Sequence, residues 1–362
     1  MRLKPKKLDL YFAKKFLATL GFILLMTALI SVVFDASEKI DDILEGDVTL
    51  HTIVFDYYFN FVPVIINLTT PLLIFLSTLY FTARLANNAE VLAVLSSGTS
   101  YYRLLVPYIA VAILLAGVDL GLKNFILPHA HAKVLAFEDR YVNGEYHYEA
   151  KNIHRQLDKQ SYFYAQGISY KERRAYRFAI DKFEGQNLVY KLTSTDAIYD
   201  STAGSWTVYN YVTRTINGLH ETLQRGDTMR IKIPITMKDF SAKSKAIATL
   251  TTPELNKFID EERFKGESLV DNYLVEKYKR IAMPFAIIIL VVIAVALGTR
   301  KVRGGIGTHL LVGILIAISY ELAMRFSTTF ATNSDLNPIL AVWLPNIVYG
   351  IAALYLLKVT PK

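Results

Sequence analysis

The sequence predicts an α-helical membrane protein with six transmembrane helices and a β domain inserted between the third and the fourth. Three observations support this fold class. Hydrophobic residues occupy 52% of the 362 positions, which is high for a soluble chain of this length. Six segments are long and apolar enough to cross roughly 30 Å of hydrocarbon. Between the third and the fourth, apolar and polar residues alternate as they do in half-buried strands.

The six apolar segments are candidate transmembrane helices. Lys14 and Lys15 precede the first one, as basic residues precede a signal sequence, but no small-residue cleavage site follows, so this helix is retained. Pro63 and Pro71 in the second segment and Pro284 in the fourth remove backbone hydrogen bonds and can kink their helices. The predicted segments are residues 16–34, 57–83, 104–122, 281–298, 309–326 and 339–357.

The distribution of basic residues predicts the orientation of these helices. Lysine and arginine are enriched in cytoplasmic connections of membrane proteins. The connection between the first and second segments is instead acidic, and the one between the fifth and sixth carries only Asp335. Both termini are therefore expected in the cytoplasm and the β segment outside. The basic stretches are residues 2–15, 84–103, 300–303 and 358–362.

The long outside segment is expected to form a β domain over residues 129–250. In "MRIKIPIT", residues 229–236, isoleucines alternate with polar residues, and "NGLHE" before it reads as a turn. Short strands without intervening helices predict a sandwich or jelly roll. A helical connector is expected over 251–280, between transmembrane regions 1–128 and 281–362. The other predicted strands are "SYFYAQ", "YRFAIDKF", "NLVYKLTST" and "WTVYNYVTRT".

A short amphipathic helix is expected over about residues 87–98, between the second and third segments. Asn87 or Asn88 can cap it, and Gly98 supplies a left-handed stop. Glu90 lies in its first turn, where a carboxylate meets the positive end of the helix dipole. Two interpretations remain open: a surface-lying connector, or a helix whose apolar stripe of Val91, Val94 and Leu95 docks into a cytoplasmic partner.

The chain resembles, over nearly its full length, the LptF/LptG family of lipopolysaccharide export permeases. The resemblance rests on "EVLAVLSSGTSYYRLL", on "NFILPHA" after the third segment, and on the C-terminal "RIAMPFAIIILVVIAVALG", "RKVRGGIG" and "LNPILAVWLPNIVYG". In such permeases the short helix is the coupling helix, inserted into the ATP-hydrolysing subunit. The resemblance therefore favours docking and assigns it Glu90, Val91, Val94, Leu95, Ser97 and Gly98.

The resemblance also implies the partners. They are a cytoplasmic ATPase dimer, a sibling permease that completes a heterodimer, a single-span periplasmic bridge protein, and lipopolysaccharide as substrate, with no nucleic acid. "GTRKVRGGIG" lacks the Ser or Thr that a phosphate-binding loop requires, so this chain is expected to be no enzyme and to bind no cofactor. ATP and Mg are used by the partner. The residues do not distinguish the F-like from the G-like sibling.

Charged residues within or beside the apolar segments are candidates for a substrate cavity. Asp119 with Lys123, and Glu321 with Arg325, are each spaced to pair along one helix face. They are either neutralised structural pairs or a source of cations for lipid phosphates. Lys39, beyond the first segment, is a further candidate, although its neighbours are acidic. Members of the family often have basic residues at the outer end of the first helix, where this chain has Phe34 and Asp35. This difference argues against a simple transfer of the family's lipid-phosphate contacts to this chain.

Aromatic and branched residues of the β segment either fill its core or line a groove for acyl chains, as the resemblance implies. The groove candidates are Phe163, Phe178, Tyr190, Trp206, Ile231 and Ile233. Two histidines near the third segment, His129 and His131, lack the carboxylates of a zinc site, so no metal is expected. The alternative functions are a permease for another amphiphile such as a lipoprotein, and an envelope scaffold or membrane enzyme without an ATPase.

Overall fold

The chain divides into two compact units. One contains Met1–Phe137 and Leu274–Lys362, and the other contains Glu138–Tyr273. The computed structural model describes residues 7–45, 48–142, 150–169, 172–236, 247–264, 270–300, 302, 304–333 and 336–360.

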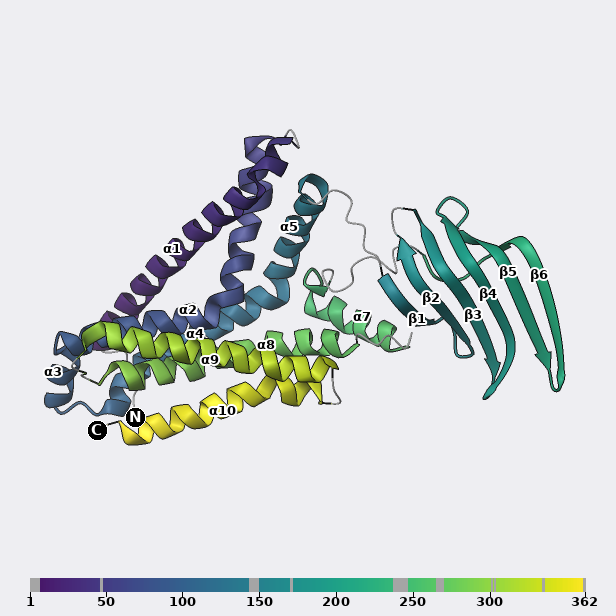
Figure 1. The fold of residues 1–362 in the computed structure, drawn as a ribbon. Coiled ribbons are helices and arrows are strands. Elements are labelled where there is room, and N and C mark those ends of the chain that lie inside the picture. The colour runs from purple at the N-terminus through teal and green to yellow at the C-terminus, as the bar shows by residue number, and fades with distance from the viewer. Residues whose placement is uncertain are drawn as a thin grey trace. The chain divides into compact units, whose positions relative to one another are not determined.

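The first unit is helical (Figure 1). Its described part contains six helical runs that are long and apolar enough to cross a membrane by length and composition, and each includes one predicted segment. The helical part of the predicted fold class is thereby confirmed. The helices are α1 (Lys7–Glu45), η1 (Thr52–Tyr58), α2 (Phe59–Asn87), α3 (Glu90–Ser96), α4 (Tyr101–Gly121), η2 (Leu122–Ile126), α5 (Leu127–Tyr141), α8 (Val270–Gly298), α9 (Gly305–Asn333) and α10 (Pro338–Val359).

The first and third runs are longer than the sequence pattern indicated. α1 continues to Glu45, and α4, η2 and α5 form one run from Tyr101 to Tyr141. Residues 129–141, which we assigned to the β domain, are therefore helical. Both extensions lie beyond the apolar windows, but neither residues 35–45 nor residues 129–141 contain a glycine or proline that would end a helix. Apolar length thus marks the hydrocarbon-crossing part of each helix, not its end.

The helix α8 lies at the centre of this unit. In its most apolar stretch 61% of the residues are buried, against 11% for α1. Small side chains make this possible: Ala286 and Ala294 are fully buried against Phe75 and Leu79 of α2. Close approach of helix backbones through small residues is the usual means of packing in membranes.

A glycine sets the closest contact between α8 and α2. A Cβ placed on Gly298 would lie 2.9 Å from the Cβ of Thr82 and 3.2 Å from the carbonyl oxygen of Leu79. Because backbone cannot move aside, we expect Gly298→Ala to destabilise the protein by about 1–3 kcal/mol. Thermal unfolding in detergent measures this. Gly350→Ala is the control, since its Cβ would have 3.9 Å of clearance, and equal midpoints for both variants would contradict the packing argument.

The second unit contains an antiparallel sheet in which the described strands follow chain order, β1 to β6 (Figure 1). Each strand pairs with the next through a hairpin, with Ile153 opposite Ala165 and Phe178 opposite Ser194. The strands are β1 (Ala150–Gln156), β2 (Ser161–Ser169), β3 (Arg174–Glu184), β4 (Asn187–Asp200), β5 (Ser205–Asn217) and β6 (His220–Ile231).

The inserted β domain is confirmed, but its edge strands differ from the pattern. The described strands form one sheet, not the two facing sheets of a sandwich, because consecutive hairpins place every strand beside its sequence neighbour. Residues 232–236 of "MRIKIPIT" lie outside the sheet, since Pro234 has no N–H for a ladder. β6 instead begins at His220, within the stretch expected to be a turn. β1 was not predicted, and β6 was predicted only over its last residues, 229–231, because most of β6 is exposed and shows no clear alternation.

One edge of the sheet is tied to a helix of the same unit. Glu262 of α7 (Thr252–Phe264) accepts a 2.9 Å hydrogen bond from Arg155 of β1, and both side chains are buried. The start of α7 is capped by Thr251, because the Glu254 carboxylate accepts from the Thr251 N–H and hydroxyl at 2.8 and 2.6 Å.

Candidate functional site

The short helix between the second and third spans exists and is α3. Its N-cap is Ala89, which adopts a left-handed φ of 60° and makes no side-chain cap. The predicted cap at Asn87 or Asn88 is wrong, because α2 runs on through Asn87 and Asn88 terminates it. The stop at Gly98 is confirmed by its φ of 83°, and the Ser100 hydroxyl caps α4 by accepting from an N–H.

The two faces of α3 have different surroundings. Val91 is buried, and Val94 and Leu95 pack with it on the core of the first unit. The predicted docking stripe thus covers this chain's own helices. The opposite face carries Leu92, which is 64% exposed, and Ser96. A partner that reached α3 would meet this second face.

The carboxylate of Glu90 is bound to α1. The Tyr11 hydroxyl donates to Glu90 Oε2 at 3.0 Å, and Lys15 Nζ lies 3.9 Å from the same oxygen. Arg103, in the first turn of α4, pairs with Asp9 of α1 at 2.5 Å. The first turns of α1 are therefore joined to the starts of both α3 and α4. The sequence pattern did not reveal these contacts, because they connect residues about 80 to 95 positions apart.

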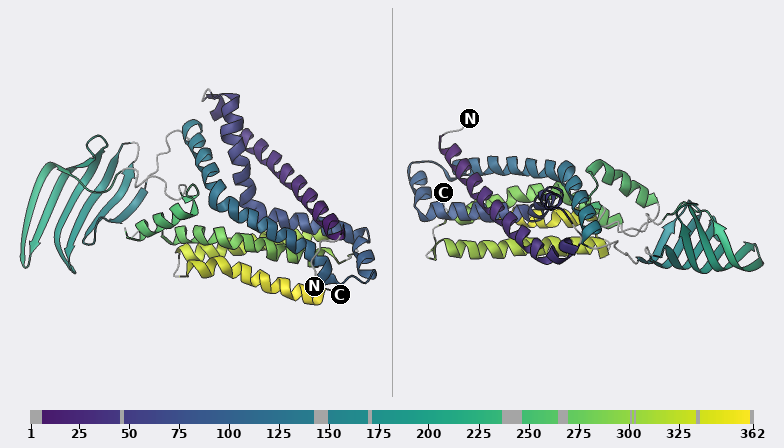
Figure 2. Two further views of the ribbon diagram at one scale, coloured as in Figure 1. Left: turned by 180° about the vertical axis from the view of Figure 1, so that it is seen from behind. Right: turned by 90° about the horizontal axis from the view of Figure 1, so that it is seen from above.

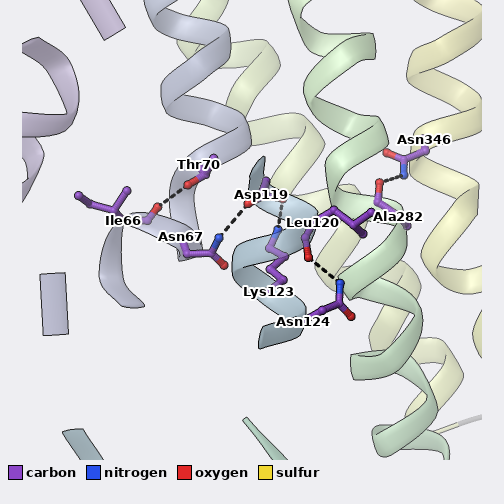
Figure 3. A network of polar contacts seen from close by, with 9 residues as sticks. All are labelled: Ile66, Asn67, Thr70, Asp119, Leu120, Lys123, Asn124, Ala282 and Asn346. Atoms are coloured by element: carbon purple, nitrogen blue, oxygen red, sulfur yellow. Dashed lines mark hydrogen bonds and ion pairs between the residues drawn. The ribbon is translucent and has the colours of Figure 1, made fainter. Parts of the chain in front are cut away.

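A buried polar network joins the second and third spans (Figure 3). Lys123 Nζ lies 2.8 Å from Asp119 Oδ2, and the Asn67 amide donates to Asp119 Oδ1 at 2.8 Å. The side chain of Asp119 is 2% exposed and that of Lys123 is 12% exposed. The spacing of the pair indicated this contact, whereas Asn67, an uncharged residue on another helix, was missed.

The same network lies where both spans bend. Pro71 has no N–H, so the Asn67 carbonyl lacks its usual helical donor. On the other span, Lys123 lies in the π-helix η2, and such insertions alter helix direction and are frequent at functional sites. Figure 1 and the left view of Figure 2 show α2 and the α4–α5 run bending together. Asn67, Asp119 and Lys123 therefore connect the two bends.

The third candidate cation, Lys39, is also paired within the chain. Its Nζ lies 2.7 Å from Asp35 Oδ1 and 5.1 Å from the centre of the Tyr57 ring. The Tyr57 hydroxyl donates to the same Asp35 oxygen at 3.0 Å. The Lys39 side chain is 15% exposed, so these groups bind one another on the C-terminal half of α1.

Arg325 differs from the other two cations in its exposure. It pairs with Glu321 at 3.0 Å, as the spacing predicts, but its side chain remains 69% exposed. Phe326 and Leu322 beside it are 64% and 46% exposed. A guanidinium on such an apolar helix surface needs an anionic or polar partner within a membrane.

The groove candidates of the β unit gather in one cluster. Phe163, Phe178 and Trp206 are buried, with ring centres 5.2 to 6.5 Å apart. The indole N–H of Trp206 donates to the Ile235 carbonyl at 2.9 Å, which brings the segment after β6 onto the sheet. Tyr190, Ile231 and Ile233 pack at the margin of the cluster, half-buried.

Tyr190, at this margin, is partly desolvated. Burial, and then the nearby Tyr211, raise the pKa of the Tyr190 phenol above its ordinary value. The three central aromatics fill the core, and the three marginal residues are half-buried at its edge. Among the described residues, no group of three histidines or carboxylates is placed to hold a metal ion.

Comparison with known proteins agrees with this architecture. The model of one family, described as lipopolysaccharide export system permease LptF/LptG, matches residues 10–359. A search of curated proteins found no match. The matched range includes all six spans, α3 and the inserted β unit. The chain is a multi-pass inner-membrane protein and belongs to the LptF/LptG family of lipopolysaccharide export permeases.

Proposed function

We propose that this chain is one of two permease subunits of an ATP-driven exporter that extracts lipopolysaccharide from the outer leaflet of the inner membrane. The lipid then passes along the β unit to a single-span periplasmic bridge protein. ATP and Mg are used by a cytoplasmic ATPase dimer, and a sibling permease completes the cavity. The family match over residues 10–359 is the observation that carries this proposal.

The orientation is part of the proposal. Basic residues near α3 and at both ends of the chain favour the cytoplasmic side for them, and the acidic connection after α1 favours the outside. The β unit then lies in the periplasm. ATP hydrolysis acts on the side of α3, and the lipid leaves on the other.

The contacts of α3 support a route by which movement of the ATPase reaches the transmembrane helices. The exposed face with Leu92 and Ser96 receives the ATPase, and Glu90 lies at the start of the same helix. Through Tyr11 and Lys15 a displacement of Glu90 acts on α1, and through Arg103 and Asp9 the start of α4 follows. The bends at Asn67 and Lys123 let the outer halves of the second and third spans change angle.

Arg325 is the residue of this chain that we expect to meet a lipid phosphate. Arg325→Gln should weaken photo-crosslinking of lipopolysaccharide to α9 by about tenfold, because a charge-assisted contact to phosphate contributes about 1.5–3 kcal/mol. Lys39→Gln is the control, since the Lys39 side chain is also paired but is only 15% exposed, against 69% for Arg325. Equal loss in both variants would contradict a specific role for Arg325.

The experiment that tests the function uses the whole complex. The tagged chain is expressed with its cognate sibling, ATPase and bridge, purified, and reconstituted in vesicles that contain lipopolysaccharide. We expect the ATPase and the sibling to copurify and lipopolysaccharide to move onto the bridge only when ATP is present. A chain that purifies alone supports the scaffold alternative. Release of a lipoprotein with retention of lipopolysaccharide supports the other amphiphile permease.

A further inference from the structure

A cavity of about 480 Å³ lies in the first unit beside α3. Val91, Leu92 and Leu95 of α3 form one apolar wall, and Val359, at the end of α10, contributes to another. Tyr101, at the start of α4, and Arg300, after the end of α8, add polar groups. The cavity thus joins the short helix to the ends of two spans from the C-terminal half of the chain.

Arg300 has unused hydrogen-bonding capacity in this cavity. Its Nε and Nη2 atoms are buried and have no hydrogen-bond partner among the described residues. Native proteins rarely leave buried donors unpaired, and the loss is larger when the group is charged. The neighbouring hydroxyls of Thr299 and Thr360 already donate to helix carbonyls at 2.9 and 2.7 Å.

The positions of the two unpaired atoms indicate the ligand's chemistry. The N–H bonds of Nε and Nη2 point in the same direction from one edge of the guanidinium plane. This edge forms two parallel hydrogen bonds with a carboxylate or a phosphate. Lys301, Arg303 and Lys358 add positive charge nearby in the sequence. The cavity is therefore suited to an anionic group that is flanked by apolar atoms.

We propose that an aspartate or glutamate side chain of the cytoplasmic ATPase enters this cavity and pairs with Arg300. The inference rests on the proposed function, which places the ATPase against the exposed face of α3. Leu92 belongs both to that face and to the cavity wall, so a partner seated on α3 also covers the cavity. An apolar neighbour of the acidic residue would fill the space between Leu95 and Val359.

Through this second contact the ATPase would also bind the C-terminal half of the permease. Contact through α3 alone acts on the second and third spans and, through Tyr11, on α1. Contact through Arg300 acts on α8, the most buried span, and lies beside the end of α10. Closure of the ATPase dimer would then move both halves of the chain together.

The test measures the affinity of the cognate ATPase for the detergent-purified permease pair. We expect Arg300→Gln to weaken binding at least about tenfold, and Arg300→Lys to weaken it less, because lysine keeps the charge but not the two parallel hydrogen bonds. Arg84→Gln is the matched control, since Arg84 is exposed and lies outside the cavity. Copurification of the sibling and an unchanged thermal midpoint verify folding of each variant.

A charge exchange identifies the partner residue. Arg300→Glu should lose binding, and a single Asp→Lys or Glu→Lys substitution in the ATPase should restore it. The inference is overturned if Arg300→Gln binds the ATPase like the unmodified chain. It is also overturned if native mass spectrometry shows that Arg300→Gln loses a bound anionic phospholipid but still binds the ATPase. Failure of the unmodified pair to bind any ATPase would instead refute the proposed function.

Discussion

Asp119→Ala lowers the free energy of unfolding by about 3–5 kcal/mol, because it leaves the buried ammonium of Lys123 without its counter-charge. Asp119 is also the acceptor for Asn67, so the substitution removes the link between the two bent spans as well. Denaturant titration of the purified protein in detergent measures the loss. This is the largest stability effect that we expect from a single substitution in the helical unit.

A double variant distinguishes the effect of the unpaired charge on stability from the effect of lost packing. Asp119→Leu combined with Lys123→Met removes both charges and keeps apolar volume, and such replacements of buried pairs are often neutral or stabilising. We expect it to regain most of the stability lost in Asp119→Ala. If the double variant is as unstable as the single one, the unpaired ammonium is not the cause of the loss.

Glu90→Ala uncouples ATP hydrolysis from lipid release. The side chain of Glu90 is 34% exposed, and exposed ion pairs contribute at most about 1 kcal/mol, so folding and assembly should change little. Release of lipopolysaccharide per ATP hydrolysed should fall roughly tenfold, a typical size for coupling between two sites. The physical reason is that α3 loses its polar connection to Tyr11 and Lys15 on α1.

The measurement is ATP turnover and lipid release in the same vesicles. Thr19→Ala is the control, since Thr19 lies on α1 outside the docking helix and its hydroxyl donates to the Lys15 carbonyl of the same helix at 2.9 Å. Tyr11→Phe should reproduce part of the Glu90→Ala effect, because it removes the 3.0 Å hydrogen bond and keeps the ring. Unchanged release in Glu90→Ala would refute the coupling role.

The sequence predicts those features that depend on one segment alone. Apolar length locates the six spans, glycine at 98 ends α3, and spacing of four residues pairs Asp119 with Lys123 and Glu321 with Arg325. These features follow from local geometry, in which residues four apart on a helix face one another. The inserted β unit follows from the alternation in its central strands.

Contacts between distant segments are not encoded in such patterns. Tyr11 and Asn67 are uncharged residues whose roles depend on which helices lie side by side. Likewise the stripe of Val91, Val94 and Leu95 indicates an apolar face but does not say whether it covers a partner or the chain itself. Edge strands such as β6 alternate weakly because neither of their faces is well buried.

The export mechanism that we propose requires α3 and the β unit to lie on opposite sides of the inner membrane. The chain has no cysteine, so a single cysteine at Ser97 or at Thr202, both exposed, reports its own side. With a membrane-impermeant maleimide and a permeabilised outer membrane, we expect Thr202→Cys to react in intact cells and Ser97→Cys to react only after the inner membrane is opened. Reaction of both from the same side would contradict the transfer of force from ATPase to lipid.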